Sequence, residues 1–406
     1  MTPDRRYGRG GGSGPGADRG HPAHGCAPGL RTLSEVRFRG SATTVLVVTA
    51  VVAAVAGALA SQSGPPRATA AHRSSVQIVK RADGLLSWRD VDQPDVFMAG
   101  TGLYLTWVTS PVPPRRAPVH EELARVGSKS GRVTAETSVR GQVMSACVDS
   151  ASLLVLVTSK GEELLRLDPI TLEQTGHWHI GRAQVPGSEA LAMVRAGGSL
   201  WIATGPELVR FTVARWKISL RIPLAGAINA DLATTTTGSV LLVGEADEGG
   251  LGHIERRGVF SGQLMSESPP LYGIVNPFLT AVTGNYFWAS EATGMMGHVQ
   301  QFSVTPLVPV GTCRTGIRTQ TCVFGTNGIT ARMSNGRLFV TQPAGGRVLN
   351  FCATTGGKVL APLPIPLSDD LRAVGKSVLF VLVPSARYRT ALKEMTIPQA
   401  CVTTRP

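Results

Sequence analysis

The sequence predicts an all-β fold, a seven-bladed β-propeller, preceded by one transmembrane helix. A strand pattern recurs seven times at a spacing of about 46 residues, which is typical of propeller blades. An uncharged apolar segment of membrane-spanning length lies near the N-terminus. Beyond residue 61 no segment keeps a helical apolar stripe for three turns, and the 47 glycines and 27 prolines indicate many turns. These observations favour strands over helices.

Three segments precede the repeats. Residues 1–40 are rich in glycine, proline and arginine without apolar periodicity, so we expect a disordered basic segment in the cytoplasm. Residues 41–61 contain the uncharged run Ala42–Ala60, close to the ~20 residues that cross a bilayer. Arginines precede this run and the next one is Arg67, so the positive-inside rule places the N-terminus in the cytoplasm and the rest outside. Residues 62–84 are expected to be a flexible linker.

A cleaved signal peptide is the alternative for residues 41–61, because Ala58-Leu59-Ala60 is a small-x-small cleavage site. Both interpretations export residues 62–406. We therefore expect a single-pass membrane protein with its propeller outside, or a secreted protein cut after Ala60.

Five of the six cysteines lie beyond the apolar run, in a compartment where disulfides persist. Cys313 and Cys322 are expected to close a local loop. Cys352 and Cys401 fall at similar points of two successive repeats and are expected to bridge adjacent blades. No pairing is predicted for Cys147. No spacing resembles a zinc site, so we predict no metal centre.

Seven copies of one pattern predict a propeller over residues 85–403. Each copy has a short apolar strand, a turn-rich gap, a second strand, a polar or glycine turn, and a third strand. A further apolar stretch before each copy, such as Ala192–Val194, is expected to be the innermost strand. The first and last copies match the pattern least well, so the expected number of blades ranges from six to eight. The copies span residues 102–139, 150–180, 197–224, 239–265, 285–310, 336–365 and 376–402.

A family resemblance rests on Leu164–Thr171, Ser199–Ala203 and Leu208–Phe211. These stretches are similar to the YVTN and quinoprotein-like β-propeller group. The resemblance implies a propeller and little about function, because propellers serve for binding, scaffolding and catalysis alike. A quinone site would be expected to show tryptophan after a glycine turn in its blades, and Thr175–Trp178 does so only in part, so no cofactor is expected.

The charge distribution argues against nucleic acid as a partner. The formal net charge is +13, but no basic run is interleaved with aromatic residues. Arg115 and Arg116 lie in a proline-rich loop of the first copy, and Arg387, Tyr388 and Arg389 lie in the equivalent loop of the last. Because these copies meet when a ring closes, the loops are expected to bind an acidic polymer or an envelope protein. Charge that merely keeps the loops soluble is the alternative.

Two adjacent repeats place a glutamate before a Gly-His pair: Glu245 precedes His253, and Glu291 precedes His298. The loops resemble those of streptogramin B lyases, seven-bladed propellers that open a lactone by acid/base chemistry on one face. The resemblance implies that these four residues are the acid/base set. Arg347 follows glycine at the same point of another repeat, so a variable loop position is the alternative.

The predicted function is a non-catalytic ligand- or protein-binding platform at the cell envelope. A lyase or hydrolase acting on the same face and a structural subunit of an envelope complex are the alternatives. His177 and His179 share one face of a strand. Because no third ligand is near them in the sequence, they are expected to lie on a solvated face.

Overall fold

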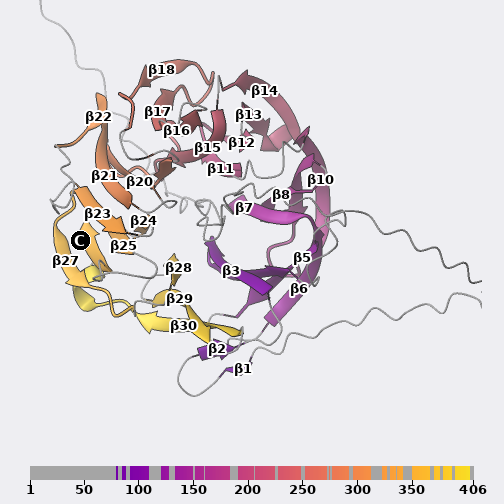
Figure 1. The fold of residues 1–406 in the computed structure, drawn as a ribbon. Helices are drawn as coiled ribbons and strands as arrows, with labels where there is room; N and C mark the ends of the chain where they lie inside the picture. The colour runs from indigo at the N-terminus through magenta and orange to yellow at the C-terminus, as the bar shows by residue number, and fades with distance from the viewer. Residues whose placement is uncertain are drawn as a thin grey trace, which may run out of the picture.

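The computed structural model shows a ring of antiparallel sheets arranged around a central axis (Figure 1). The structure describes residues 79–80, 85–87, 92–108, 120–127, 133–149, 151–159, 161–182, 191–204, 206–224, 227–247, 252–271, 274, 277–291, 296–311, 322–326, 330–334, 336–341, 350–365, 370–374, 378–385 and 389–402.

The described strands form seven sheets, the number of repeats predicted from the sequence, and each sheet is one blade. Blade 1 holds β3 (Asp92–Ala99), β4 (Gly102–Val108), β5 (His120–Val126) and β6 (Val133–Arg140). Blade 2 holds β7 (Gln142–Asp149), β8 (Ser152–Thr158), β9 (Gly161–Leu167) and β10 (Gln174–Arg182). Blade 3 holds β11 (Leu191–Ala196), β12 (Ser199–Thr204), β13 (Glu207–Thr212) and β14 (Lys217–Pro223).

The remaining blades follow the same order from the axis outward (Figure 1). Blade 4 holds β15 (Ala227–Thr234), β16 (Leu241–Asp247), β17 (Gly252–Arg257) and β18 (Leu264–Glu267). Blade 5 holds β19 (Pro277–Leu279), β20 (Tyr286–Glu291), β21 (Met296–Val304) and β22 (Leu307–Pro309), with β23 (Cys322–Thr326) also paired to β21. Blade 6 holds β24 (Thr330–Ser334), β25 (Arg337–Thr341), β26 (Phe351–Thr354) and β27 (Val359–Pro362). Blade 7 holds β28 (Asp370–Val374), β29 (Val378–Ser385) and β30 (Arg389–Thr396).

Blade 7 is completed by the N-terminal end of the domain. β2 (Leu85–Ser87) pairs antiparallel with β30, and β1 (Val79–Lys80) pairs with β2. The innermost strand of blade 7, β28, contacts β3 of blade 1, so the ring is closed. β1 lies within residues 62–84, so strand pairing begins inside the segment predicted as linker. The repeat pattern did not predict these two closing strands.

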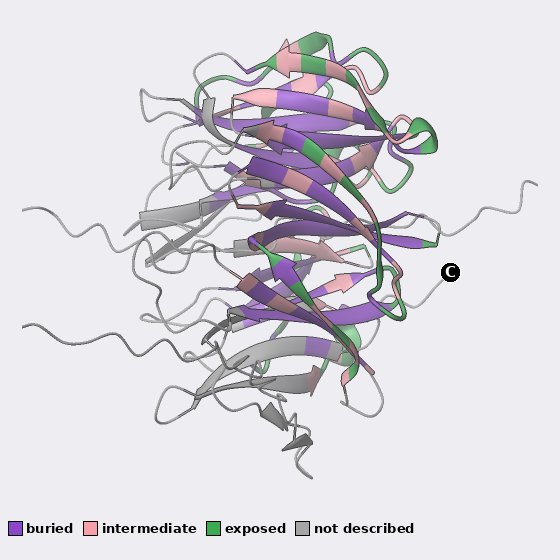
Figure 2. Ribbon diagram, turned by 90° about the vertical axis from the view of Figure 1, so that its right-hand side faces the viewer, coloured by how far each residue is buried: buried purple, intermediate pink, exposed green. Residues whose placement is uncertain are grey.

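The ring has two structurally different ends. Neighbouring strands of a blade are antiparallel, so the turns between first and second strands and between third and fourth strands lie at one end, here called the turn end. The links between second and third strands and from blade to blade lie at the other, here called the connection end. Many turn-end hairpins are tight, as at Gly197 and Gly198, whose φ of +56° and +70° favour glycine. Exposed turns lie along the right-hand side of the ring in Figure 2.

The core lies between blades rather than within one sheet. Every residue of β12 is buried because both faces of this inner strand contact neighbouring blades. The outer strand β14 instead alternates exposed and half-buried residues. This explains the continuous apolar runs of the inner strands and the period-two alternation of the outer ones.

Aromatic side chains at the turn end join blades in pairs. Trp201 of β12 donates its Nε1–H to the Val259 carbonyl oxygen in the next blade, at 3.1 Å. Trp288 of β20 likewise donates to the carbonyl oxygen of Thr355 at 3.2 Å, and the Tyr104 hydroxyl donates to that of Pro169 at 3.0 Å. Each bond links a second strand to the turn between the third and fourth strands of the following blade.

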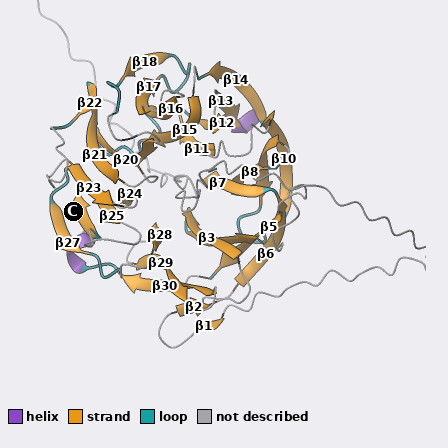
Figure 3. Ribbon diagram, viewed as in Figure 1, coloured by secondary structure: helices purple, strands orange, loops and turns teal. Residues whose placement is uncertain are grey.

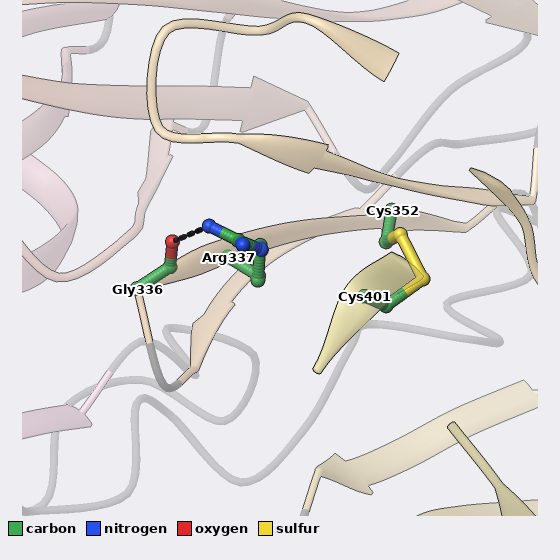
Figure 4. Close-up of a disulfide and its surroundings, with 4 residues drawn as sticks. All are labelled: Gly336, Arg337, Cys352 and Cys401. Atoms are coloured by element: carbon green, nitrogen blue, oxygen red, sulfur yellow. Dashed lines mark hydrogen bonds between the residues drawn. A yellow bond between two sulfur atoms is a disulfide. The ribbon is translucent and has the colours of Figure 1, made fainter. Parts of the chain in front are cut away.

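Cys352 of β26 and Cys401, the pair predicted from the repeat spacing, form a disulfide (Figure 4). Cys401 lies in the 3-10 helix η2 (Gln399–Cys401), which follows β30 and contacts β27. The bond therefore ties blade 6 to the chain that leaves blade 7. Cys147 is buried in β7. Cys313 and the side chain of Cys322 lie outside the described residues, so their pairing stays a prediction.

The described helices are η2 and η1 (Val213–Arg215), which are one turn each (Figure 3). In the described part of the chain, no helix has the length and apolar character needed to span a membrane. The predicted membrane segment Ala42–Ala60 lies outside that part.

Candidate functional site at the connection end

The third strands of blades 1 to 4 begin at the connection end with titratable residues. In blade 2, Glu162 and Glu163 directly follow the short link from β8. In blade 4, His253 occupies the position that Glu207 holds in blade 3. The members of this set with described side chains are His120, Glu121, Glu122, Glu162, Glu163, Glu207 and His253.

Glu245 and His253 are brought together, as the sequence predicted for these two residues. They are cross-strand partners in β16 and β17, and His253 Nε2 lies 3.5 Å from Glu245 Oε2. Val243, two residues before Glu245 and on the same face, belongs to the core cluster that Trp201 and other residues of blade 3 form with blade 4. The pair therefore lies on the face of blade 4 that is turned toward blade 3.

Glu255 and Arg257 complete this cluster. They follow His253 at two-residue intervals in β17, so all three side chains share one face. Arg257 Nε donates to Glu255 Oε2 at 2.5 Å, and Arg257 Nη1 donates to the carbonyl oxygen of Gly262 at 3.0 Å. One ligand atom from each of Glu245, His253 and Glu255 lies within 4.8 Å of the others.

Burial and the contact between Glu245 and His253 shift the pKa values of this cluster. The Glu255 pKa is raised above its usual range, first by burial and then by the charge of Glu245, while Arg257 opposes the shift. The His253 pKa is raised chiefly by its hydrogen bond to Glu245, against the effect of burial. Two acids and an imidazole so placed can hold a proton between them or coordinate a cation.

A second group of charged residues lines a cavity of about 360 Å³ between blades 2 and 3. Glu162 and Leu164 share the face of β9 that packs against blade 3, and Glu207 lies on the facing side of β13. Arg221 Nη1 donates to Glu207 Oε2 at 2.7 Å, and Arg221 Nη2 donates to the Ile180 carbonyl oxygen. The lining residues are Glu162, His179, Ile180, Gly181, Thr204, Pro206, Glu207 and Arg221.

Glu162 is the perturbed acid of this cavity. Glu162 is 3% exposed. Burial raises the pKa of its carboxyl group to about 7; the charge of Glu207 adds to this shift and Arg221 opposes it. Gly181 lies directly beside Glu162 Oε2, where a β-carbon would overlap the carboxylate. The absence of a side chain at Gly181 thus makes room for a charged group at the blade interface.

The other predicted acid/base residues stay untested. The β20–β21 ladder pairs Ser290 with Val299, and Glu291 and His298 are the next residues along each strand. Their side chains lie outside the described residues.

Both histidines of β10 are exposed, as predicted. His177 Nε2 lies 3.3 Å from Glu163 Oε2, on the face away from the cavity, whereas His179 borders the cavity. The β9–β10 ladder is regular from His177 to His179, and bulges lie just before and just after this stretch, between Gln174 and Gly176 and between His179 and Gly181.

The predicted arginine loops attach to the connection end. One joins β4 to β5, and the other joins β29 to β30, and the blades that carry them are neighbours. Arg115, Arg116, Arg387 and Tyr388 lie outside the described residues, as does the side chain of Arg389, the first residue of β30. Their role in binding stays a prediction.

Glu255, Arg257, Glu162 and Arg221 were not predicted as site residues. The sequence signal for the first two was available, because His253, Glu255 and Arg257 alternate within one predicted strand. Nothing comparable marks Glu162 and Arg221, which belong to different blades.

No family model matches the chain, and no curated protein is similar to it in sequence. Three solved propeller structures are similar in fold. BamB from Moraxella catarrhalis is 12% identical, with 73% of this chain and 81% of that chain covered and a TM-score of 0.44. The β-propeller domain of Cps50 (Swd1) from Myceliophteria thermophila is 14% identical (69% and 95% covered, TM-score 0.45), and KlHsv2 with a replaced loop is 12% identical (76% and 97% covered, TM-score 0.45). Sequence identities and TM-scores this low support no inference about ligand or partner.

Proposed function

We propose that this chain is an exported, membrane-anchored β-propeller of the YVTN and quinoprotein-like type that binds a ligand or partner at its connection end. The observation that carries the proposal is the cavity between blades 2 and 3, where the buried carboxylate of Glu162 meets Glu207 and Arg221. The volume of this half-open pocket falls within the range of small-ligand sites, and several charged groups converge on it. The function is binding rather than catalysis.

An ammonium group is the ligand chemistry that this cavity favours. It brings two carboxylates, from Glu162 and Glu207, against one guanidinium, and Arg221 is already engaged with Glu207 and a carbonyl oxygen. A small amine, or a lysine side chain of an envelope partner, would supply the missing positive charge beside Glu162. The arginine loops would extend the same face toward an acidic polymer or acidic partner segment.

Calorimetry of the full-length protein in detergent, titrated with cadaverine, tests the binding site. We expect cadaverine to bind and its uncharged analogue pentanediol not to bind. Glu162→Gln should weaken cadaverine binding by about tenfold or more, because a charge-assisted hydrogen bond is lost. Glu163→Gln is the matched control, since Glu163 lies next to Glu162 but on the opposite face. No binding by the wild type, or equal binding by Glu162→Gln, would contradict the proposal.

Export is tested through the Cys352–Cys401 disulfide. In cells that make the full chain, both thiols should resist alkylation until a reductant is added. A chain without residues 1–61 should stay in the reducing cytosol and be alkylated directly. Retention of the full chain in carbonate-washed membranes would favour an anchor over a cleaved signal peptide.

A lyase or hydrolase is the second candidate, favoured by the 3.5 Å contact between Glu245 and His253. In such an enzyme His253 would be the proton-transfer group and Glu245 would orient it. The comparison of Glu245→Gln with Glu291→Gln in a lactone-opening assay tests this candidate, because the predicted set requires both. Wild-type protein without activity on cyclic esters would remove it.

A further inference from the structure

The cluster of Glu245, His253 and Glu255 presents an imidazole nitrogen and two carboxylate oxygens within 4.8 Å of one another. The three side chains come from the adjacent strands β16 and β17, so their spacing is set by backbone hydrogen bonds rather than by a loop. Strand-borne ligands of this kind are pre-organised for a metal ion.

A second observation points to a ligand. The Glu245 side chain is 2% exposed, and its Oε1 atom is buried without a hydrogen-bond partner in the described part of the chain. The other oxygen, Oε2, faces His253. A desolvated carboxylate oxygen without a donor is unfavourable, and a bound cation at this place would satisfy it.

The surrounding residues hold the cluster in place. Arg257 fixes one oxygen of Glu255 and is itself held by the Gly262 carbonyl oxygen. Trp201 of blade 3 bonds to Val259 in the same turn, which keeps blades 3 and 4 together at this interface. Such outer hydrogen bonds orient ligand side chains in metal sites.

We propose that Glu245, His253 and Glu255 form a binding site for a divalent transition-metal cation such as Zn²⁺ between blades 3 and 4. One imidazole and two carboxylates suit Zn²⁺ or Mn²⁺ better than Mg²⁺ or Ca²⁺, which prefer oxygen ligands alone. The His253 side chain is 18% exposed, which gives the ion a route from solvent. The site is separate from the cavity that carries the proposed function, so either can fail without the other.

A charge network without metal is the competing explanation. Protonated His253 and Arg257 would then balance the carboxylates of Glu245 and Glu255, and removal of any member would affect only stability. The two explanations differ in whether a cation is taken up.

Calorimetric titration of chelator-treated, untagged full-length protein separates them. We expect one equivalent of Zn²⁺ to bind, with Mg²⁺ at least about tenfold weaker. Glu245→Gln and His253→Asn should each reduce Zn²⁺ affinity by more than about 100-fold, beyond what loss of an outer hydrogen bond costs. His177→Ala, which removes the exposed histidine beside Glu163, is the matched control and should leave affinity unchanged.

Cobalt substitution of the wild type provides a readout that needs no variant to fold. Co²⁺ bound by one nitrogen and two oxygens should give visible ligand-field bands that an equivalent of Zn²⁺ abolishes. Absence of Zn²⁺ uptake and of these bands would overturn the proposal. Full Zn²⁺ affinity in a folded His253→Asn variant would overturn it equally.

Discussion

The two ends of the ring are built differently although the same strands reach both. At the turn end, blades are joined by side chains that bond to backbone carbonyl oxygens, such as Trp201 to Val259 and Trp288 to Thr355. At the connection end, the described interfaces hold charged groups that face other charged groups, as in the Glu162 cavity and the Glu245 cluster. The turn end also holds an ion pair between blades, Arg195 of blade 3 with Asp149 of blade 2. The difference is therefore one of emphasis: the pocket and the cluster of carboxylates lie at the connection end, whereas the aromatic links between blades lie at the turn end.

The turn end is also where arginines are held in contacts with neighbouring groups and where apolar side chains are exposed. Arginines of the turn end are engaged in structure: the Arg166 guanidinium lies 4.5 Å from the Trp216 ring centroid, and Arg210 Nη1 donates to the Phe260 carbonyl oxygen at 2.6 Å. Among the described residues, the exposed large apolar side chains also lie at this end: Ile170, Phe260, Leu264, Met265, Tyr286, Val308 and Val359. The difference teaches that one repeat unit can carry different kinds of side chain at its two ends.

Truncation of Trp201 tests the scaffold end and should have the largest effect. Trp201→Ala removes a fully buried ring and its hydrogen bond, and we expect about 3–5 kcal/mol less unfolding free energy. Trp201→Phe keeps most of the packing and should cost about 1–2 kcal/mol. Denaturant titration measures both. If folded Trp201→Phe also loses cadaverine binding, the two ends are not independent.

Removal of the disulfide should have the next largest effect. Cys352→Ser combined with Cys401→Ser opens a loop of 49 residues, and we expect a loss of about 2–4 kcal/mol. Unfolding of the wild type in the presence of a reductant should match unfolding of this variant. A wild type that is insensitive to the reductant would show that the bond does not contribute to stability.

The pH dependence of stability tests the connection end. Glu162 has a pKa of about 7 in the folded chain against a usual value of 4.5, so the folded state holds the proton more tightly. Stability from this group is present below about pH 4.5 and is lost as the pH rises through about 7. We expect a loss of about 1–2 kcal/mol after allowance for solvent screening.

The Glu162→Gln variant isolates that contribution. Its stability should fall less between about pH 5 and about pH 8 than that of the wild type, because glutamine does not titrate. Thermal unfolding across this range measures the difference, with Glu163→Gln as control. Parallel profiles for wild type and Glu162→Gln would assign the pH dependence to other groups.

The smallest effect is expected at the exposed rim of the turn end. Phe260 is 68% exposed, so Phe260→Ser should change the unfolding free energy by no more than about 0.5 kcal/mol. Cadaverine and Zn²⁺ binding should be unchanged. A clear loss of either ligand would extend the functional surface beyond the connection end.

Much of the fold could be predicted because its strands repeat. The buried runs of β8 and β12 and the alternation of β14 are visible in the sequence as apolar runs and period-two patterns. Closure by β2 was not predicted, because three residues without a repeat signature carry no pattern. Tertiary pairing with β30, rather than local propensity, makes that segment a strand.

The candidate site was predicted only where its residues share a hairpin. Glu245 and His253 are cross-strand neighbours, and their distance follows from one turn. Glu162 and Arg221 meet across two blades, so their contact depends on how the sheets pack. Spacing in a single sequence does not encode that packing.

Closure of blade 7 by β2 also determines when the ring can be completed during synthesis of the chain. Leu85 pairs with Lys393, so β2 must wait for a partner synthesised about 300 residues later. Until then the outer edge of β30 does not exist, and the edges of the first and last blades are open to wrong pairing. The period during which these edges are unpaired is therefore as long as the synthesis of the domain.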